Sequence, residues 1–67
     1  MNWLLKYARE ASGKTQKQVA EAAEITLRAY QNYEYDFQTP TVRTAIRIAT
    51  ALNSTVEALF SGEKKGE

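Results

Sequence analysis

The side chains best suited to chemistry lie close together in the middle of the chain. Gln31 and Asn32 follow Arg28 by three and four residues, a spacing that places all three on one face of a helix. A guanidinium can donate two hydrogen bonds to guanine and a side-chain amide can pair with adenine, so this face could contact base edges in the major groove of DNA. The alternative is a solvated surface, with Arg28 paired to Glu24 at i,i+4 spacing and the amides facing water.

Several residues around this face can also be interpreted in two ways, as DNA contacts or as ordinary surface or packing residues. Gln16 could extend to a base or a phosphate from the start of a preceding helix, where free N–H groups favour anions, or it could be an exposed first-turn residue. Lys14 and Lys17 flank that start and could meet phosphates or remain solvated. Leu27 is apolar where solvent is expected, so it could touch a thymine methyl group or pack against the turn. Arg43 is a further phosphate candidate.

The composition argues against catalysis. The chain contains no His and no Cys, so the usual bases, nucleophiles, disulfides and zinc ligands are missing. Glu21 and Glu24 form an acidic i,i+3 pair, which an exposed acidic helix face explains, and no Gly-rich phosphate loop is present. The sequence therefore predicts no enzyme, no cofactor, no metal site and no small-molecule ligand.

Length and charge restrict the remaining classes. The 67 residues suffice for one domain, expected over residues 1–60 with a flexible tail at 61–67. No run approaches the roughly 20 apolar residues of a membrane helix, and the opening lacks the regions of a signal peptide, so no membrane partner and a cytoplasmic location are expected. The net charge is only +1, so any DNA binding must depend on where the charges lie.

The elements that must position these residues are four or five short helices, with no predicted strand. Each helix begins after a residue that can accept a hydrogen bond from the first turn. Gly13 ends the first helix near Ser12, Asn53 in the left-handed conformation ends the fourth, and Gln18 completes a capping box with the second N-cap. The expected N-caps are Asn2, Thr15, Thr26, Thr41 and Thr55.

Apolar residues at three- and four-residue spacing predict the buried face of each helix, and together they predict a compact all-α bundle. Trp3 and Tyr7 lie off the first stripe and form an aromatic ledge, expected to be covered by the fifth helix or by a partner subunit. The expected core residues are Met1, Leu5, Ala8, Val19, Ala20, Ala23, Ile25, Ala29, Tyr30, Tyr33, Val42, Ala45, Ile46, Ala49, Leu52, Val56, Leu59 and Phe60.

An ordered set of residues between Leu5 and Phe60 resembles the Cro/repressor-type (phage lambda repressor-like) helix-turn-helix family. The resemblance implies a fold of five helices in which the second and third form the motif, joined by a turn over residues 23–26. It also implies binding to double-stranded operator DNA, commonly as a homodimer. The residues that carry it are Arg9-Glu10, Gly13, Thr15-Gln16, Val19-Ala20, Ile25-Thr26, Glu34, Pro40, Ile48-Ala49 and Ala51-Leu52.

The same resemblance implies roles for individual residues. Arg9 and Glu34 match a pair that joins the first helix to the end of the third as an internal ion pair. Positions facing bases, or beside the DNA backbone and near a base, fall on Gln16, Leu27, Arg28 and Asn32, with Gln31 on the same ridge. Positions facing phosphates fall on Thr15, on the N-terminus of the second helix, and on the loop from Tyr35 to Gln38. Thr26, the N-cap of the third helix, is a further candidate for a phosphate contact.

The chain also departs from the family pattern. Glu24 and Asp36 stand where Gly is frequent in the family, and both add negative charge near the expected DNA face. At Glu24 this predicts backbone strain or an altered turn. Tyr30 replaces a smaller aliphatic residue and must bury its ring while finding a partner for its hydroxyl. Asn53-Ser54 replaces a common Gly-aliphatic pair.

The hypothesis from the sequence is a sequence-specific DNA-binding transcriptional regulator, a repressor that reads the major groove with its third helix (residues 26–33). A homodimer would contact two half-sites about one DNA turn apart. The rival is a protein-interaction module on the same fold, such as an antitoxin or co-regulator. A third alternative is a domain cut from a longer regulator.

Overall fold

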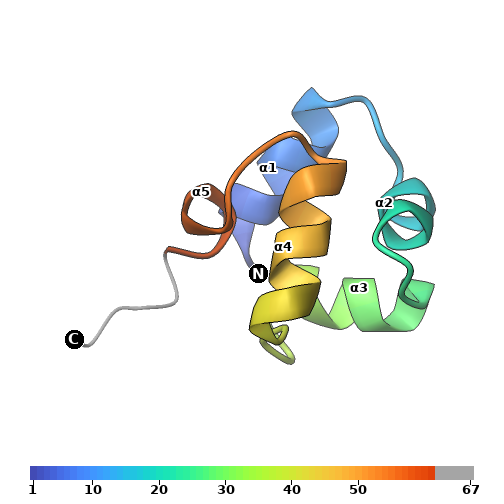
Figure 1. Cartoon of the computed structure of the whole chain (residues 1–67), viewed down its shortest axis with the longest axis vertical. Coiled ribbons are helices and arrows are strands. Elements are labelled where there is room, and N and C mark those ends of the chain that lie inside the picture. Colours follow the sequence, from blue (N-terminus) through green and yellow to red (C-terminus); the bar gives the residue numbers. More distant parts are fainter. Residues whose placement is uncertain (62–67) are drawn as a thin grey trace.

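The computed structural model describes residues 1–61, which form five helices around one core (Figure 1). The all-α architecture predicted from the sequence is confirmed, and residues 1–61 contain no strand. No helix within this range is long and apolar enough to cross a bilayer. Of the predicted tail, only Ser61 lies within the described residues, where it ends the fifth helix. The helices are α1 (Trp3–Ala11), α2 (Gln16–Ala22), α3 (Leu27–Glu34), α4 (Val42–Ala51) and α5 (Val56–Phe60).

Each helix begins at the N-cap predicted from the sequence. In all five cases the cap side chain accepts a hydrogen bond from the backbone N–H three residues later, which satisfies one of the unpaired donors of the first turn. The Gln18 side chain completes the capping box by accepting from the Thr15 N–H at 2.9 Å. These caps fix where the short helices start, and thereby which side chains begin α2 and α3.

Four turns place a residue in the left-handed region. Gly13 has φ 74°, and the three side-chain-bearing residues Glu24, Asp36 and Asn53 have φ 61°, 66° and 55°. The predicted conformations at Gly13 and Asn53 are confirmed, and of the two alternatives at Glu24 the strained backbone is the one observed. Asp36 is in the same strained region, which was not predicted. A residue with a Cβ is disfavoured there by about 1–2 kcal/mol because Cβ approaches the following carbonyl oxygen. The turn between α2 and α3 therefore forms at a cost in stability.

Relieving this strain should stabilise the protein. Glu24 is exposed, so Glu24→Gly removes no buried contact, and we expect it to raise the free energy of unfolding by about 0.5–1 kcal/mol after the greater chain entropy of glycine is subtracted. Urea unfolding followed by circular dichroism measures the change. Glu24→Gln is the matched control, because it removes the charge and keeps the Cβ. Equal stabilisation by both variants would assign the effect to charge and contradict the strain argument.

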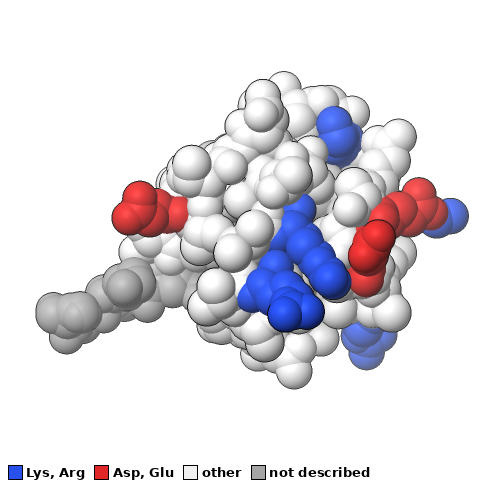
Figure 2. All heavy atoms as spheres, in the orientation of Figure 1, with Lys and Arg blue, Asp and Glu red and all other residues white. Residues whose placement is uncertain are grey.

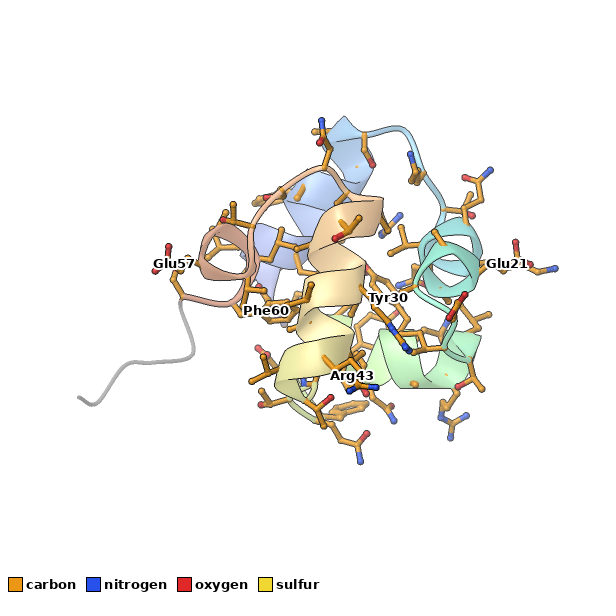
Figure 3. All side chains as sticks on the ribbon, viewed as in Figure 1. Glu21, Tyr30, Arg43, Glu57 and Phe60 are labelled. Carbon is orange, nitrogen blue, oxygen red and sulfur yellow. The ribbon has the colours of Figure 1, made fainter. Side chains whose placement is uncertain are left out.

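The core is built around α4, which lies across the middle of the bundle in Figure 1 and packs against α2 and α5. Helix α1 packs on α5 and α3, and α2 packs on α3. Tyr30 is fully buried and is directed into the space between these helices (Figure 3). The remaining buried apolar residues are Leu5, Val19, Ala20, Ala23, Ala45, Ile48, Ala49, Leu52, Leu59 and Phe60.

Three residues predicted for the core are exposed instead. Met1 is at the surface, and Val42 and Ile46 on α4 are 75% and 52% exposed, whereas Ile48, absent from the predicted core, is fully buried. The reason is that two sets of four apolar positions on α4 have the same helical spacing. Residues 42, 45, 46 and 49 form one set and residues 45, 48, 49 and 52 the other. The helix buries the second set, which leaves the first partly outside.

The prediction that α5 covers the aromatic ledge of α1 is also wrong. Trp3 and Tyr7 are exposed, with ring centroids 5.6 Å apart. Helix α5 approaches α1 from the side of Asn2, whose Nδ2 donates to the carbonyl of Leu59 at 3.0 Å. The ledge therefore lies open within the part of the chain that the structure describes.

Candidate nucleic-acid interface

One ridge of α3 projects away from the rest of the protein. In Figure 1 this helix lies on the lower side of the molecule, next to the loop that follows it and the start of α4, which reach slightly lower. Arg28 and Leu27 are exposed, while Gln31 and Asn32 are half-buried. Within residues 1–61 the Arg28 guanidinium has no ion pair or hydrogen bond, so the pairing with Glu24 considered from the sequence does not form. Its donors are available to a ligand.

The opposite side of α3 is held by a buried ion pair. Glu34 is fully buried, and its carboxylate receives two bonds from Arg9, with Nε at 2.8 Å from Oε2 and Nη2 at 3.2 Å from Oε1. The predicted pair is thus present, with both carboxylate oxygens engaged. Arg9 also donates from Nη1 to the carbonyl of Lys14 at 3.1 Å. One guanidinium therefore joins α1, the residue just before the α2 cap, and the end of α3.

Two further donors complete the coordination of Glu34. The Tyr30 hydroxyl donates to Oε2 at 2.6 Å, and Gln16 Nε2 donates to Oε1 at 2.7 Å. The partner that Tyr30 needed for its hydroxyl is therefore Glu34, one turn away on the same helix. Four donated hydrogen bonds fill the roughly four acceptor positions of a carboxylate. No buried side-chain polar atom within residues 1–61 is left without a partner.

This coordination determines the charge state of the buried groups. Burial by itself would raise the pKa of Glu34, but the hydrogen bonds from Arg9, Tyr30 and Gln16 outweigh it and lower the pKa below its usual value. Burial and the bond to this carboxylate raise the pKa of the Tyr30 hydroxyl. At neutral pH Glu34 is therefore ionised and can only accept hydrogen bonds, while Tyr30 is protonated and donates one.

The two glutamines placed near DNA by the sequence contact each other. Gln31 Nε2 donates to Gln16 Oε1 at 3.1 Å, and Gln16 Nε2 donates to Glu34 and also to the Tyr35 hydroxyl at 3.3 Å. The structure thus brings the start of α2, the middle of α3 and the residue after α3 into one polar cluster. The sequence identifies these residues separately, and it does not predict that they bond to one another.

The loop after α3 folds back over the end of that helix. Asn32 accepts from the backbone N–H groups of Phe37 and Gln38 at 2.8 and 3.2 Å through its carbonyl, and its side chain makes a long contact of 3.4 Å with the Gln38 side chain. Phe37 is 74% exposed beside Tyr35, with ring centroids 6.2 Å apart. The sequence places Phe37 only as part of the phosphate-facing loop from Tyr35 to Gln38, and its exposed ring was not predicted. The signal that could have identified it is an aromatic residue within a polar loop.

The candidate phosphate contacts surround the start of α2 and α3. Lys17 is exposed and Lys14 half-buried, and the N–H groups of Gln16 and Lys17 donate to no other residue within 1–61. The oxygens of Thr15 and Thr26 accept cap hydrogen bonds, which leaves their hydroxyl protons for an outside acceptor. Arg43 is exposed on the first turn of α4 (Figure 3).

Part of the negative charge near this surface is paired within the protein. Glu34 is buried and paired, and the Asp36 carboxylate lies 3.1 Å from the amino group of Met1. Two of the four acidic residues between Gly13 and Arg43 therefore have a cationic partner. On the face drawn in Figure 2, basic side chains gather over α4, and acidic ones lie on the α5 side and on the α2 side, where they reach the edge of the basic group. Figure 3 labels Glu57 on α5 and Glu21 on α2, and Glu24 lines the same hollow as Arg47.

Two helices joined by a short turn, with the second exposing a polar ridge, define a helix-turn-helix protein. A family model described as helix-turn-helix matches residues 5–59 of the chain, from α1 to α5. The chain therefore belongs to the Cro/repressor-type, lambda repressor-like helix-turn-helix family, a family of DNA-binding regulators that are generally not enzymes. No curated protein and no solved structure matches it significantly.

Proposed function

We propose that this protein is a sequence-specific transcriptional repressor that inserts α3 into the major groove of operator DNA. The observation that carries the proposal is the division of α3 into two sides. One side is fixed by the buried Glu34 carboxylate, and the other presents Arg28 without a partner among residues 1–61. A rigid helix with an unpaired guanidinium at its exposed start suits bidentate recognition of guanine.

The remaining residues of the surface have complementary roles in this proposal. Leu27, 40% exposed beside Arg28, would touch a thymine methyl group, and Asn32 would pair with an adenine. The phosphate contacts would position the helix without reading sequence, and they would come from Lys14, Thr15, Lys17, Thr26, Tyr35, Gln38 and Arg43.

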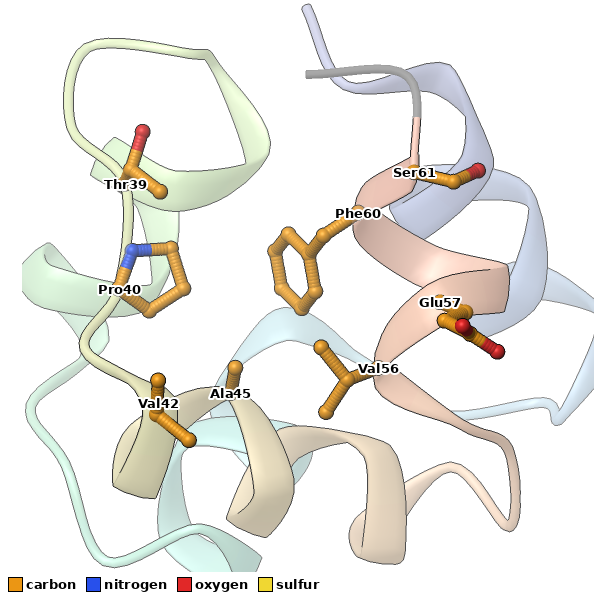
Figure 4. A pocket seen from close by; sticks show the side chains of 8 residues that line it. All are labelled: Thr39, Pro40, Val42, Ala45, Val56, Glu57, Phe60 and Ser61. Atoms are coloured by element: carbon orange, nitrogen blue, oxygen red, sulfur yellow. The ribbon is translucent and has the colours of Figure 1, made fainter. Parts of the chain in front are cut away.

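We further propose that the protein binds DNA as a homodimer. A groove between α5 and the start of α4 is lined by apolar side chains, with Phe60 and Val56 on one wall and Pro40 and Val42 on the other (Figure 4). Burial of this surface by a second copy would present two α3 helices to one duplex. Duplexes selected from a random pool should then contain two inverted half-sites about one turn apart.

A protein-interaction module on the same fold is the second candidate. The observation in its favour is exposed apolar surface, at Phe37 in the loop after α3 and at Trp3 and Tyr7 on α1, combined with a net charge of only +1. Such a protein would bind a protein partner through these residues and would not bind duplex DNA through α3.

A salt titration separates the two candidates. If α3 and its flanking cations meet DNA, a fluorescent random duplex should bind weakly at about 50 mM salt, and its affinity should fall steeply by about 200 mM because counterions are released from the phosphates. Fluorescence anisotropy measures both. Arg28→Glu tests whether the binding passes through α3, since it should abolish the signal while the fold, followed by circular dichroism, persists. Absence of duplex binding at low salt would favour the interaction module.

A further inference from the structure

Gln16 has no side-chain donor left for DNA. Its Nε2 carries two hydrogens, and these are directed to Glu34 Oε1 at 2.7 Å and to the Tyr35 hydroxyl at 3.3 Å. Its Oε1 accepts from Gln31 at 3.1 Å. Only one acceptor position of Gln16 remains, and an acceptor cannot bind a phosphate oxygen. The side chain that the sequence places nearest the DNA backbone is therefore used inside the protein.

The buried Glu34 carboxylate fixes the direction of the hydrogen bonds among Glu34, Gln16 and Gln31. The Glu34 carboxylate can only accept, so the nitrogen of Gln16 must face it and the Gln16 oxygen must face Gln31. Gln31 must in turn direct its nitrogen to Gln16. Its Oε1 and one remaining N–H are left for an outside partner.

The same argument fixes the direction of Tyr35. Its oxygen accepts from Gln16, so its own proton points elsewhere. Tyr35 is exposed, and it can donate that proton to a group outside the protein such as a phosphate oxygen.

We propose that Gln16 is a positioning residue that sets the hydrogen-bond direction of Gln31 and Tyr35 at the DNA surface, so that Gln31 selects adenine over guanine. Adenine presents one donor and one acceptor in the major groove, which the outward Oε1 and N–H of Gln31 match. Guanine presents two acceptors, O6 and N7, and one of them would face Gln31 Oε1. This inference rests on the proposed function, since it assumes that α3 lies in the major groove.

The test compares base preference in single and double variants. Gln16→Met keeps the length of the side chain and removes every hydrogen bond, which frees both amide hydrogens of Gln31 for guanine. With duplexes differing only at the base pair facing Gln31, we expect the preference for adenine to fall about tenfold in Gln16→Met. In a Gln31→Met background, Gln16→Met should change the preference no further, because the two residues act through one contact.

A matched control lies on the same helix. Gln18 is an exposed glutamine of α2 whose side-chain oxygen accepts only from the Thr15 N–H among residues 1–61, so Gln18→Met should leave the preference unchanged. Gln16→Ala is the second variant, with the same expected shift, and thermal melting of each variant confirms that it is folded at the assay temperature.

The possible outcomes separate a failure of this inference from a failure of the proposed DNA-binding function. Additive effects of Gln16→Met and Gln31→Met would show that Gln16 contacts DNA directly, and equal weakening of every duplex would show a structural role only; either result overturns the inference and leaves a DNA-binding α3 intact. If the wild-type protein binds all duplexes equally, the proposed function is wrong, and the inference, which depends on it, is wrong as well.

Discussion

Replacing Arg9 with alanine is expected to lower the free energy of unfolding by about 3–5 kcal/mol. The variant leaves the fully buried Glu34 carboxylate without its cation, and it removes the 3.1 Å bond that holds the carbonyl of Lys14. A domain of this size has a total stability on the order of 3–10 kcal/mol, so much of the population should be unfolded. Urea unfolding at pH 7, followed by circular dichroism, measures the loss.

The pH dependence of the stability lost in Arg9→Ala should identify Glu34 as the source of that loss. Because the folded pKa of Glu34 is lowered, its contribution to wild-type stability is present above the unfolded value of about 4.3 and is lost as the pH falls through the folded pKa. Without Arg9, burial favours the protonated carboxyl. The difference in stability between wild type and Arg9→Ala should therefore narrow in acid, and a constant difference would contradict this account.

A second ion pair on α1 supplies the control. Lys6 and Glu10 are 2.6 Å apart at i,i+4 spacing and lie at the surface. Since exposed pairs contribute little, Lys6→Ala should leave the urea midpoint nearly unchanged. An equal loss in both variants would mean that the instability comes from α1 itself and not from the buried carboxylate.

Replacing Arg28 with alanine is expected to remove discrimination at a single base pair. The guanidinium is exposed and unpaired within residues 1–61, so its loss should leave the fold unaffected. A bidentate contact to guanine contributes about 1–3 kcal/mol of discrimination, which corresponds to roughly a 5- to 150-fold preference. Anisotropy competition with duplexes altered one base pair at a time, starting from a selected site, measures this preference.

Lys17→Ala is the matched comparison, because Lys17 is an exposed cation at the start of α2. A phosphate contact reads no sequence, so this variant should weaken all duplexes alike and reduce the salt dependence by about one counterion. Uniform weakening by Arg28→Ala as well would show that Arg28 also binds phosphate and that sequence is read elsewhere.

The helix boundaries were predictable because they depend on local chemistry. Each N-cap acts on an N–H three residues away, and Gly13 and Asn53 end their helices through their own backbone conformations. The buried face of α4 was not predictable in the same way. Val42 and Ile46 satisfy the same spacing as Ile48, and the choice between the two apolar faces depends on where α2 and α5 pack.

The candidate site shows the same difference between features set by local sequence and features set by helix packing. Arg28 was identifiable because an exposed charged residue on α3 needs no other residue to define it. The Arg9–Glu34 pair came from family resemblance, since 25 residues separate the two in sequence. The bonds of Gln16 to Glu34, Tyr35 and Gln31 span 15 to 19 residues and require the packing of α2 on α3, which the helical patterns leave undetermined.

The lengths of the helices have a consequence for how the protein behaves in solution. The five helices contain between 5 and 10 residues each. Helices shorter than about 12–15 residues are marginal in water on their own, so each of these depends on its neighbours to exist. We therefore expect α3 to form only when the whole bundle forms. The molecules that can bind an operator are then the same molecules that are folded. Every change that lowers the folded fraction therefore lowers the DNA-binding fraction by the same amount.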